Sequence, residues 1–289
     1  MRAVSGLVLL PAAMVLLGFF VLPMAFVVAT SLQSGVGIGS GIGRYVLFFS
    51  DPYYQNILLR TLWIALAVVL CTLILGYPVA YWLVRTESRF RMLFRGLVFF
   101  PLITSSIVRT FGWIILLSNN GFVNNILAAL GLDEVQFLYR SQGIIIGLAH
   151  VLLPFMILTL MGALGNIDPA LEQASRSLGA SPWRSFYRIV LPMSIPGVIA
   201  GSLLVFALST SAFVTPALLG GMQAPMMATL IYRQAVVAYD LPSAAATSMV
   251  LLTITVILVT FYYRVARPLP LNRMEVPLSR MEVRKAEGV

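Results

Sequence analysis

Charged side chains are scarce in this sequence of 289 residues: only 10% are Asp, Glu, Lys or Arg. Soluble globular domains carry about twice that share. Apolar residues make up 60%, and several apolar runs approach the length of about 20 residues that crosses a bilayer as a helix. The composition therefore predicts an all-α membrane protein. A β-barrel is excluded because its strands would alternate apolar and polar residues in segments of about ten.

Cysteine and histidine are almost absent, with one residue of each. Cys71 lies in an apolar run and has no second cysteine with which to form a disulfide or a metal site. His150 has no Cys, His or carboxylate at a ligand spacing, so we expect it to pack or to hydrogen-bond between helices. We predict no metal site and no catalytic residue.

A run of five or six like charges is also lacking, although the net charge is +9. Such a run is typical of a nucleic-acid-binding tail, so we predict no nucleic-acid partner. In a membrane protein, arginines beside the spans mark the cytoplasmic side instead. The basic residues are therefore evidence on topology, and lipid is the expected surrounding.

The apolar runs predict six transmembrane helices in a single domain over residues 1–289. Their approximate ranges are 7–31, 57–84, 93–117, 142–164, 195–219 and 244–266. The first run is longer than the apolar part of a usual signal peptide and is not followed by a small-residue cleavage motif. We therefore expect it to be a retained span.

The arginines favour one orientation of these spans. If the N-terminus is cytoplasmic, fourteen of the nineteen basic residues lie inside, whereas Arg44, Arg60, Arg140 and Arg233 lie outside. Basic residues concentrate on the cytoplasmic side. Both termini and the segment 165–194 are therefore predicted to be cytoplasmic.

The segment 165–194 is a polar interruption of an otherwise apolar chain. Asp168 followed by Pro169 is typical of a helix start, as is Asp51 followed by Pro52, because Asp accepts bonds from free N–H groups and proline fits the first turn. Gly179 suits the position just past the end of the helix. We predict a short exposed helix over residues 169–178.

A second amphipathic stretch begins at Ser181-Pro182. Its aromatic and arginine faces are also typical of a helix that lies on lipid headgroups. Pro192 and Pro196 are expected to break the chain before the fifth span.

The segment resembles the cytoplasmic signature of binding-protein-dependent ABC importer permeases: Glu-Ala-Ala, then Gly, then nine residues, then Ile-x-Leu-Pro. The spacing is intact, but Gln173 stands for the usual Glu and Ser175 for the second Ala. The ionic contact with the ATPase is then weaker or shifted to the preceding residue, Glu172. The residues that the resemblance assigns to ATPase coupling are Glu172, Gln173, Ala174, Ser175, Leu178, Gly179, Ile189, Leu191 and Pro192.

This resemblance implies the type I ABC importer permease fold, with a short coupling helix that docks in a groove on an ATP-hydrolysing subunit. The sequence has no G-x-x-x-x-G-K-[ST] loop. ATP and Mg²⁺ would therefore be bound by a separate ATPase dimer, and this chain would need no cofactor. The expected partners are a second, different permease and an extracytoplasmic substrate-binding protein, at a bacterial inner membrane.

Further segments resemble the spermidine/putrescine-type permeases of this family, and in particular the first of their two permeases. They comprise residues 75–80, 101–109, 121–125, 152–156 and 213–221. Two of these segments lie at or beside hydroxyl groups of the predicted spans and Arg109, the one arginine near the middle of a predicted span. The candidate pathway residues are Ser105, Ser106, Arg109, Thr110, Ser209, Thr210, Ser211 and Thr215.

Two interpretations of the pathway residues stay open. A charge at mid-span costs about 2.5–3.5 kcal/mol on insertion scales, so Arg109 should face protein or water. Small hydroxyl residues, however, also occur where helices simply pack closely.

The solute also stays open. The predicted spans contain no Asp or Glu, so a cationic polyamine would meet no fixed countercharge in this subunit, although the partner permease could supply one. An amino acid, an opine or an aminophosphonate is the alternative solute. An ion-coupled secondary transporter is the alternative class, but it would usually carry an intramembrane acid or an inverted repeat.

Overall fold

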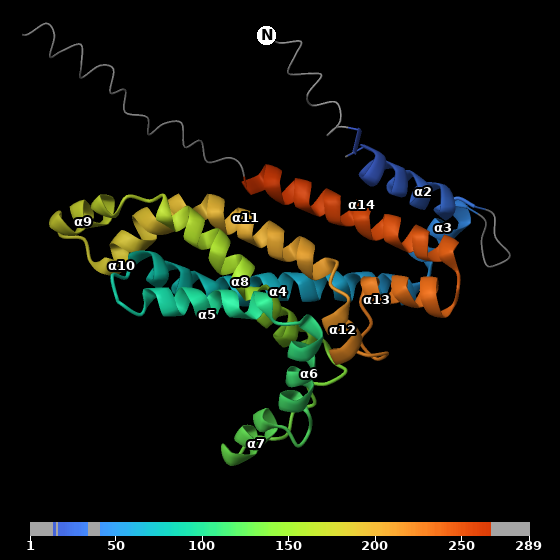
Figure 1. The fold of residues 1–289 in the computed structure, drawn as a ribbon, viewed down its shortest axis with the longest axis horizontal. Coiled ribbons are helices and arrows are strands. Elements are labelled where there is room, and N and C mark those ends of the chain that lie inside the picture. Colours follow the sequence, from blue (N-terminus) through green and yellow to red (C-terminus); the bar gives the residue numbers. More distant parts are fainter. Residues whose placement is uncertain (1–13, 16, 34–40, 267–289) are drawn as a thin grey trace, which may run out of the picture.

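The computed structural model describes residues 14–15, 17–33 and 41–266, and these residues form helices joined by short loops (Figure 1). Residues 7–13 and 16 of the first predicted span lie outside the described residues. In chain order, with η marking π-helical turns, the elements are η1 (Leu17–Val21), α2 (Leu22–Ser31), α3 (Ile42–Ser50), α4 (Pro52–Arg85), α5 (Arg91–Ile103), α6 (Ser106–Leu117), α7 (Phe122–Ala129), α8 (Ser141–Gly165), α9 (Pro169–Ser177), α10 (Pro182–Ser185), η2 (Phe186–Val190), α11 (Leu191–Thr210), α12 (Val214–Leu219), α13 (Met227–Tyr232), η3 (Arg233–Val237) and α14 (Leu241–Ala266).

Four of the described helices are long and apolar enough to cross a bilayer: α4, α8, the continuous helix Pro182–Thr210, and Leu241–Arg264 within α14. The ends of α8 lie within one residue of the predicted span 142–164. Helix α4 begins five residues before the predicted span 57–84, at the helix start that Asp51 and Pro52 predict, because the Asp51 side chain accepts a hydrogen bond from Tyr53 N at 2.8 Å and so caps the helix. The apolar helix Leu17–Ser31 is shorter and packs against α14.

The third predicted span, 93–117, is a bent pair of helices rather than one helix. The axes of Arg91–Ile103 and Ser106–Ala129 differ by 99°. Thr104 and Ser105 between them have extended backbone angles. Pro101 removes one hydrogen bond from the last turn of α5. Figure 1 shows α6 and α7 projecting sideways from the long bundle.

The fifth predicted span, 195–219, also differs. The expected break at Pro192 and Pro196 is wrong, since one helix continues from Pro182 to Thr210. The π-helical turn η2 precedes Pro192 and shifts the hydrogen-bond register by one residue, with Leu191 N donating to Phe186 O. This wider turn accommodates a proline that lacks an N–H. The chain breaks instead after Thr210, and α12 follows as a separate short helix.

Helices α4, α8 and α11 form the packed centre of the molecule. Ile64, Met156 and Val205, one from each helix, are fully buried there. The approach of α11 to α8 depends on Gly197, because a Cβ atom at this position would collide with the Cβ of Ala163. Small residues of this kind allow membrane helices to pack closely.

The long helices place two sets of short elements at opposite ends of the bundle (Figure 1). One end, called here the α9 end, carries α9, α10 and the start of α5. The other, the α13 end, carries α3, α13 and the start of α4. The long helices connect these two ends (Figure 1).

Replacement of Gly197 by Leu is expected to loosen the contact between α8 and α11, because overpacking costs about 1–3 kcal/mol. Gly162→Leu is the matched control, since a Cβ at Gly162 in α8 meets no atom within 4 Å. Thermal unfolding of the purified chain in detergent checks this. Equal unfolding temperatures for the two variants would contradict the assignment of Gly197 to the helix contact.

Candidate functional site

Helix α9 is a short, exposed helix with a defined start and end, as its sequence predicts. Asp168 accepts a hydrogen bond from Ala170 N at 2.8 Å and caps the first turn. Gly179 has φ +83°, a left-handed conformation that favours glycine. Gly179 N donates to Arg176 O, and Ala180 N donates to Ser175 O at 3.1 Å. These bonds form the Schellman motif, which fixes where α9 stops.

Several signature residues of α9 face outward. Gln173, Ala174 and Gly179 are exposed, and Leu178 is 89% exposed. Pro192 is exposed as well, whereas Ser175, Ile189 and Leu191 are half-buried. An open groove of about 510 Å³ lies beside α9, and its lining includes Ala174, Ser175, Leu178, Gly179 and Ile189. Leu178 thus places an exposed apolar side chain beside this groove.

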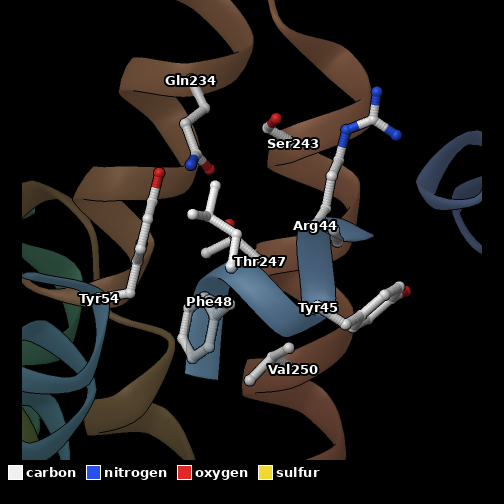
Figure 2. A pocket seen from close by; sticks show the side chains of 10 residues that line it. Arg44, Tyr45, Phe48, Tyr54, Gln234, Ser243, Thr247 and Val250 are labelled. Atoms are coloured by element: carbon white, nitrogen blue, oxygen red, sulfur yellow. The ribbon is translucent and has the colours of Figure 1, made fainter. Parts of the chain in front are cut away.

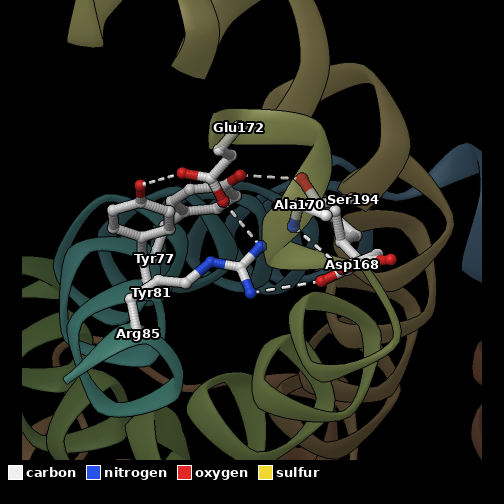
Figure 3. A network of polar contacts seen from close by, with 8 residues as sticks. Tyr77, Tyr81, Arg85, Asp168, Ala170, Glu172 and Ser194 are labelled. Carbon is white, nitrogen blue, oxygen red and sulfur yellow. Dashed lines mark hydrogen bonds and ion pairs between the residues drawn. The ribbon is translucent and has the colours of Figure 1, made fainter. Parts of the chain in front are cut away.

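Glu172 does not belong to this exposed face. It is only 7% exposed, and its Oε1 lies 2.6 Å from Nη2 of Arg85, at the end of α4. Its Oε2 accepts a hydrogen bond from the Tyr81 hydroxyl at 2.9 Å (Figure 3). The Glu172 carboxylate is therefore bound within the chain. The hypothesis that Glu172 takes over the ionic contact with the ATPase stays a prediction, and such a contact would require Glu172 to leave these partners.

The partners of Glu172 belong to one face of α4. Tyr77, Tyr81 and Arg85 are spaced by four residues, so they lie one above another along the helix; we call them the α4 stripe. The Tyr77 hydroxyl is 2.7 Å from Ser194 Oγ of α11, and Arg85 donates to Ile167 O at 3.1 Å. The residues predicted from the sequence do not include this set, although two tyrosines and an arginine at intervals of four near the end of an apolar helix are a recognisable pattern.

Two of the predicted pathway residues come together. Thr110 of α6 and Thr215 of α12 are both buried, and their hydroxyl oxygens are 3.3 Å apart. Thr110 also donates to Ser106 O at 2.7 Å. Ser105 is exposed at the bend between α5 and α6. Thr110, in α6 just beyond the bend, thus places a hydroxyl group next to Thr215 of α12.

The remaining hydroxyl residues of the fifth span bond locally. Thr210 and Ser211 donate to backbone carbonyls of their own helix. Ser209 is fully buried, and its hydroxyl has no hydrogen-bond partner among the described residues. None of these three makes a side-chain hydrogen bond to α6 within the described part of the chain. Their geometry agrees with the packing interpretation.

Arg109 lies one residue from Thr110, on α6. Its Nε and Nη1 atoms are buried, and within the described ranges they have no hydrogen-bond partner. One turn along α6, Trp113 donates to His150 Nδ1 of α8 at 3.2 Å, so the prediction that His150 bonds between helices is confirmed. The half-buried guanidinium of Arg109 therefore has two donors, Nε and Nη1, without a partner among the described residues, and such donors favour a carboxylate or carbonyl ligand.

A second hollow, at the α13 end, is lined by Arg44, Tyr54, Gln234 and Thr247 among others (Figure 2). Its volume is about 20 Å³, which is room for about one water molecule. It is too small for an organic solute. No group of three His, Cys, Asp or Glu residues fit to hold a metal occurs within residues 14–15, 17–33 and 41–266.

Apolar spanning helices and an exposed, capped helix bearing this signature define a membrane permease of an ATP-driven importer. The chain belongs to the family of binding-protein-dependent transport system inner membrane components, which matches residues 72–269. Members of the family are permease subunits without catalytic activity, and ATP is hydrolysed by a separate subunit. The alternative of an ion-coupled secondary transporter is thereby set aside.

The chain is also similar to curated permease proteins of spermidine/putrescine transport systems. The chain is 36% identical to the spermidine/putrescine transport system permease protein PotB of Escherichia coli K12, over 75% of this chain and 80% of that protein. It is 35% identical to the PotB protein of Salmonella typhimurium SL1344, over 75% and 76%. It is 32% identical to the PotB protein of Haemophilus influenzae, over 86% and 89%.

Solved structures show the same fold at lower identity. A bacterial alginate ABC transporter, crystallised with an alginate pentasaccharide-bound periplasmic protein, aligns with a TM-score of 0.77 at 22% identity, over 91% of this chain and 94% of that one. The MetNI methionine ABC transporter, in inward-facing crystals, aligns with a TM-score of 0.54 at 20% identity, over 72% and 92%. The chain therefore has the type I ABC importer permease fold.

Replacement of Arg109 by Ala is expected to slow solute uptake by about tenfold, a change of roughly 1.4 kcal/mol in the barrier, while assembly of the importer is unchanged. The reason is that the substitution removes Nε and Nη1 of Arg109, which are buried donors without a partner among the described residues, from the candidate solute pathway. Uptake in cells and the yield of purified complex are measured together, with Arg140→Ala, an exposed arginine, as the control. Normal uptake kinetics in Arg109→Ala would make Arg109 a packing residue.

Proposed function

We propose that this chain is the first of two different permease subunits in an ATP-driven importer of a polyamine such as spermidine or putrescine. The observation that carries the proposal is its 32–36% identity to bacterial PotB proteins over three quarters or more of its length. Relatives that match so much of a permease share the architecture around the solute path. The proposed solute follows from what those relatives are described to carry.

The charge distribution adds a requirement to this proposal. The described spanning helices contain no Asp or Glu, and they contain Arg109. A polycation would therefore need carboxylates from the second permease, and its selection would rest on the extracytoplasmic binding protein. The same feature keeps an amino acid, an opine or an aminophosphonate as the second candidate, since each carries an anionic group that Arg109 could bind.

Energy input is proposed to enter through α9. The exposed face of α9, with Gln173, Ala174, Leu178 and Gly179, would seat in a groove on one subunit of an ATPase dimer that binds ATP and Mg²⁺. Gln173 retains hydrogen-bonding capacity but not the charge of the usual Glu. The contact would therefore rest on the apolar Leu178 and on the shape of the capped helix end.

The proposed topology places the α9 end in the cytoplasm and both termini on the same side. Arg85, Arg91, Arg184 and Arg188 belong to the last turn of α4, the first turn of α5, α10 and η2, all at the α9 end. Arginine at this end is what the cytoplasmic side of a membrane protein carries. A bacterial inner membrane is the proposed location.

Spermidine uptake is the direct test. Cells without their own polyamine importers are supplied with this chain, its second permease, its ATPase and its binding protein. Labelled spermidine should accumulate about tenfold faster than in cells that lack only this chain, an expectation on the scale of a 1.4 kcal/mol change in barrier. Uptake of a labelled amino acid or aminophosphonate, but not of spermidine, would overturn the polyamine assignment and favour the second candidate.

Replacement of Gly179 by Val is expected to weaken association with the ATPase, because a β-branched residue is strained at φ +83° and the end of α9 would shift. Gly131→Val is the matched control: Gly131 also has a positive φ, +74°, with no atom within 4 Å of an added Cβ, but it follows α7, far from α9. The ATPase that co-purifies with each variant is quantified. Equal recovery from both would argue against α9 as the docking element.

A further inference from the structure

We propose that Glu172 is a positioning residue that fastens the coupling helix α9 to the α4 stripe, so that a displacement of α9 is transmitted to α4. This inference rests on the proposed docking of α9 on an ATPase. The inference goes beyond the docking proposal because it assigns Glu172, the acid of the signature region, a role within the chain. The ATPase would move α9, and the pair of Glu172 with Arg85 would carry that movement into the membrane domain.

The first support is that Arg85 holds α9 at two points. Its Nη2 pairs with Glu172 Oε1 at 2.6 Å, and its Nη1 donates to Ile167 O at 3.1 Å. Ile167 directly precedes Asp168, the residue that caps α9. One guanidinium therefore binds both the entry to α9 and its first turn, which restricts rotation of α9 as well as translation (Figure 3).

The second support is that the same stripe ties down the other elements of the segment. Tyr77 bonds Ser194 of α11 at 2.7 Å. The rings of Tyr77 and Tyr81 both stand edge-on to Phe186 in η2, with centroids 5.7 and 5.5 Å apart from it. The stripe thus contacts α9, η2 and α11. These three elements are held against a single helix rather than against each other alone.

The third support is the reach of α4. Its 34 residues span about 51 Å at 1.5 Å per residue, from the α9 end to the α13 end. There, Thr61 is fully buried and its Oγ1 accepts a hydrogen bond from Met227 N of α13 at 2.9 Å. Arg60 donates to Gln223 O at 3.3 Å. A movement applied at Glu172 therefore has a bonded route to the opposite face of the molecule.

Burial makes the pair sensitive to the loss of one member. Glu172 is 7% exposed, and a buried charge that loses its partner is strongly destabilising, whereas an exposed pair contributes little. The pair also leaves Glu172 unable to face a docked protein without first leaving Arg85. The geometry thus separates two roles: exposed residues of α9 for recognition, and Glu172 for transmission.

Glu172→Gln is the test variant, because it keeps the size and the hydrogen-bond acceptor and removes the charge. Glu87→Gln is the matched control, since Glu87 is an exposed acid in the loop after α4, at the same end of the bundle. The assembled importer is reconstituted in lipid vesicles. ATPase recovery, ATP hydrolysis and spermidine transported per ATP hydrolysed are measured for each variant.

Glu172→Gln is expected to retain the ATPase and to hydrolyse ATP but to lower transport per ATP by about tenfold, within the range of coupling between paired residues in contact. Arg85→Gln should do the same, and the double variant should be no worse than either single one. Hydrogen exchange at α9 in the purified chain, which needs no ATPase, should be faster in Glu172→Gln than in Glu87→Gln.

Two results would overturn the proposal. Unchanged transport per ATP in Glu172→Gln, with faster exchange at α9, would reduce the pair to a local structural contact. Loss of the ATPase from Glu172→Gln with unchanged exchange would return Glu172 to the docking surface. Tyr81→Phe keeps the ion pair and removes only the bond of 2.9 Å, so its transport per ATP should stay close to the wild-type value. If Glu172→Gln assembles poorly, Arg85→Gln, which breaks the same pair from α4, replaces it in both comparisons. If the proposed function is wrong, the wild-type complex itself does not transport spermidine, and this result is distinguished from an effect of Glu172→Gln.

Discussion

The ion pair between Arg85 and Glu172 is the contact on which the arrangement of the α9 end depends. A carboxylate in a short polar helix would ordinarily face water, but here it is withdrawn against α4 and bound by two side chains. This leaves Leu178 and Gly179, just past the end of α9, exposed beside a groove that Arg184 and Arg188 also line. The proposed docking surface and the proposed anchor therefore belong to one helix of nine residues and its end.

The membrane imposes the second constraint. Within the bilayer every backbone polar group must be bonded inside the protein or line a water-filled cavity. The bend at Thr104 and the break after Thr210 lie at the level where Thr110 and Thr215 meet. Irregular backbone in spans of transport proteins is tolerated where it lines a path. The bend and the break together mark where this subunit presents its polar groups and Arg109.

Much of this architecture follows from local sequence rules. The ends of α8, the Asp51 and Asp168 caps and the glycine end of α9 are decided by residues within a few positions of one another, so the sequence predicts them. The direction of Glu172 depends on Tyr81 and Arg85, about ninety residues earlier, and no local pattern reveals it. The helix passes through Pro192 by way of a π-helical turn, and the bend of 99° at Thr104 lies where α6 turns away from α5 and packs against α12. Tertiary contacts override proline and periodicity signals at these points.

The central claim is that α9 docks on an ATPase while Glu172 remains bound to Arg85. Structures of the assembled importer, by electron cryomicroscopy without nucleotide and with a non-hydrolysable ATP analogue, test it most directly. The account predicts that α9 seats in the ATPase in both states and that Glu172 and Arg85 stay within ion-pair distance while α9 and the end of α4 move together. An α9 that does not touch the ATPase, or a Glu172 that leaves Arg85 to bind the ATPase, would contradict it.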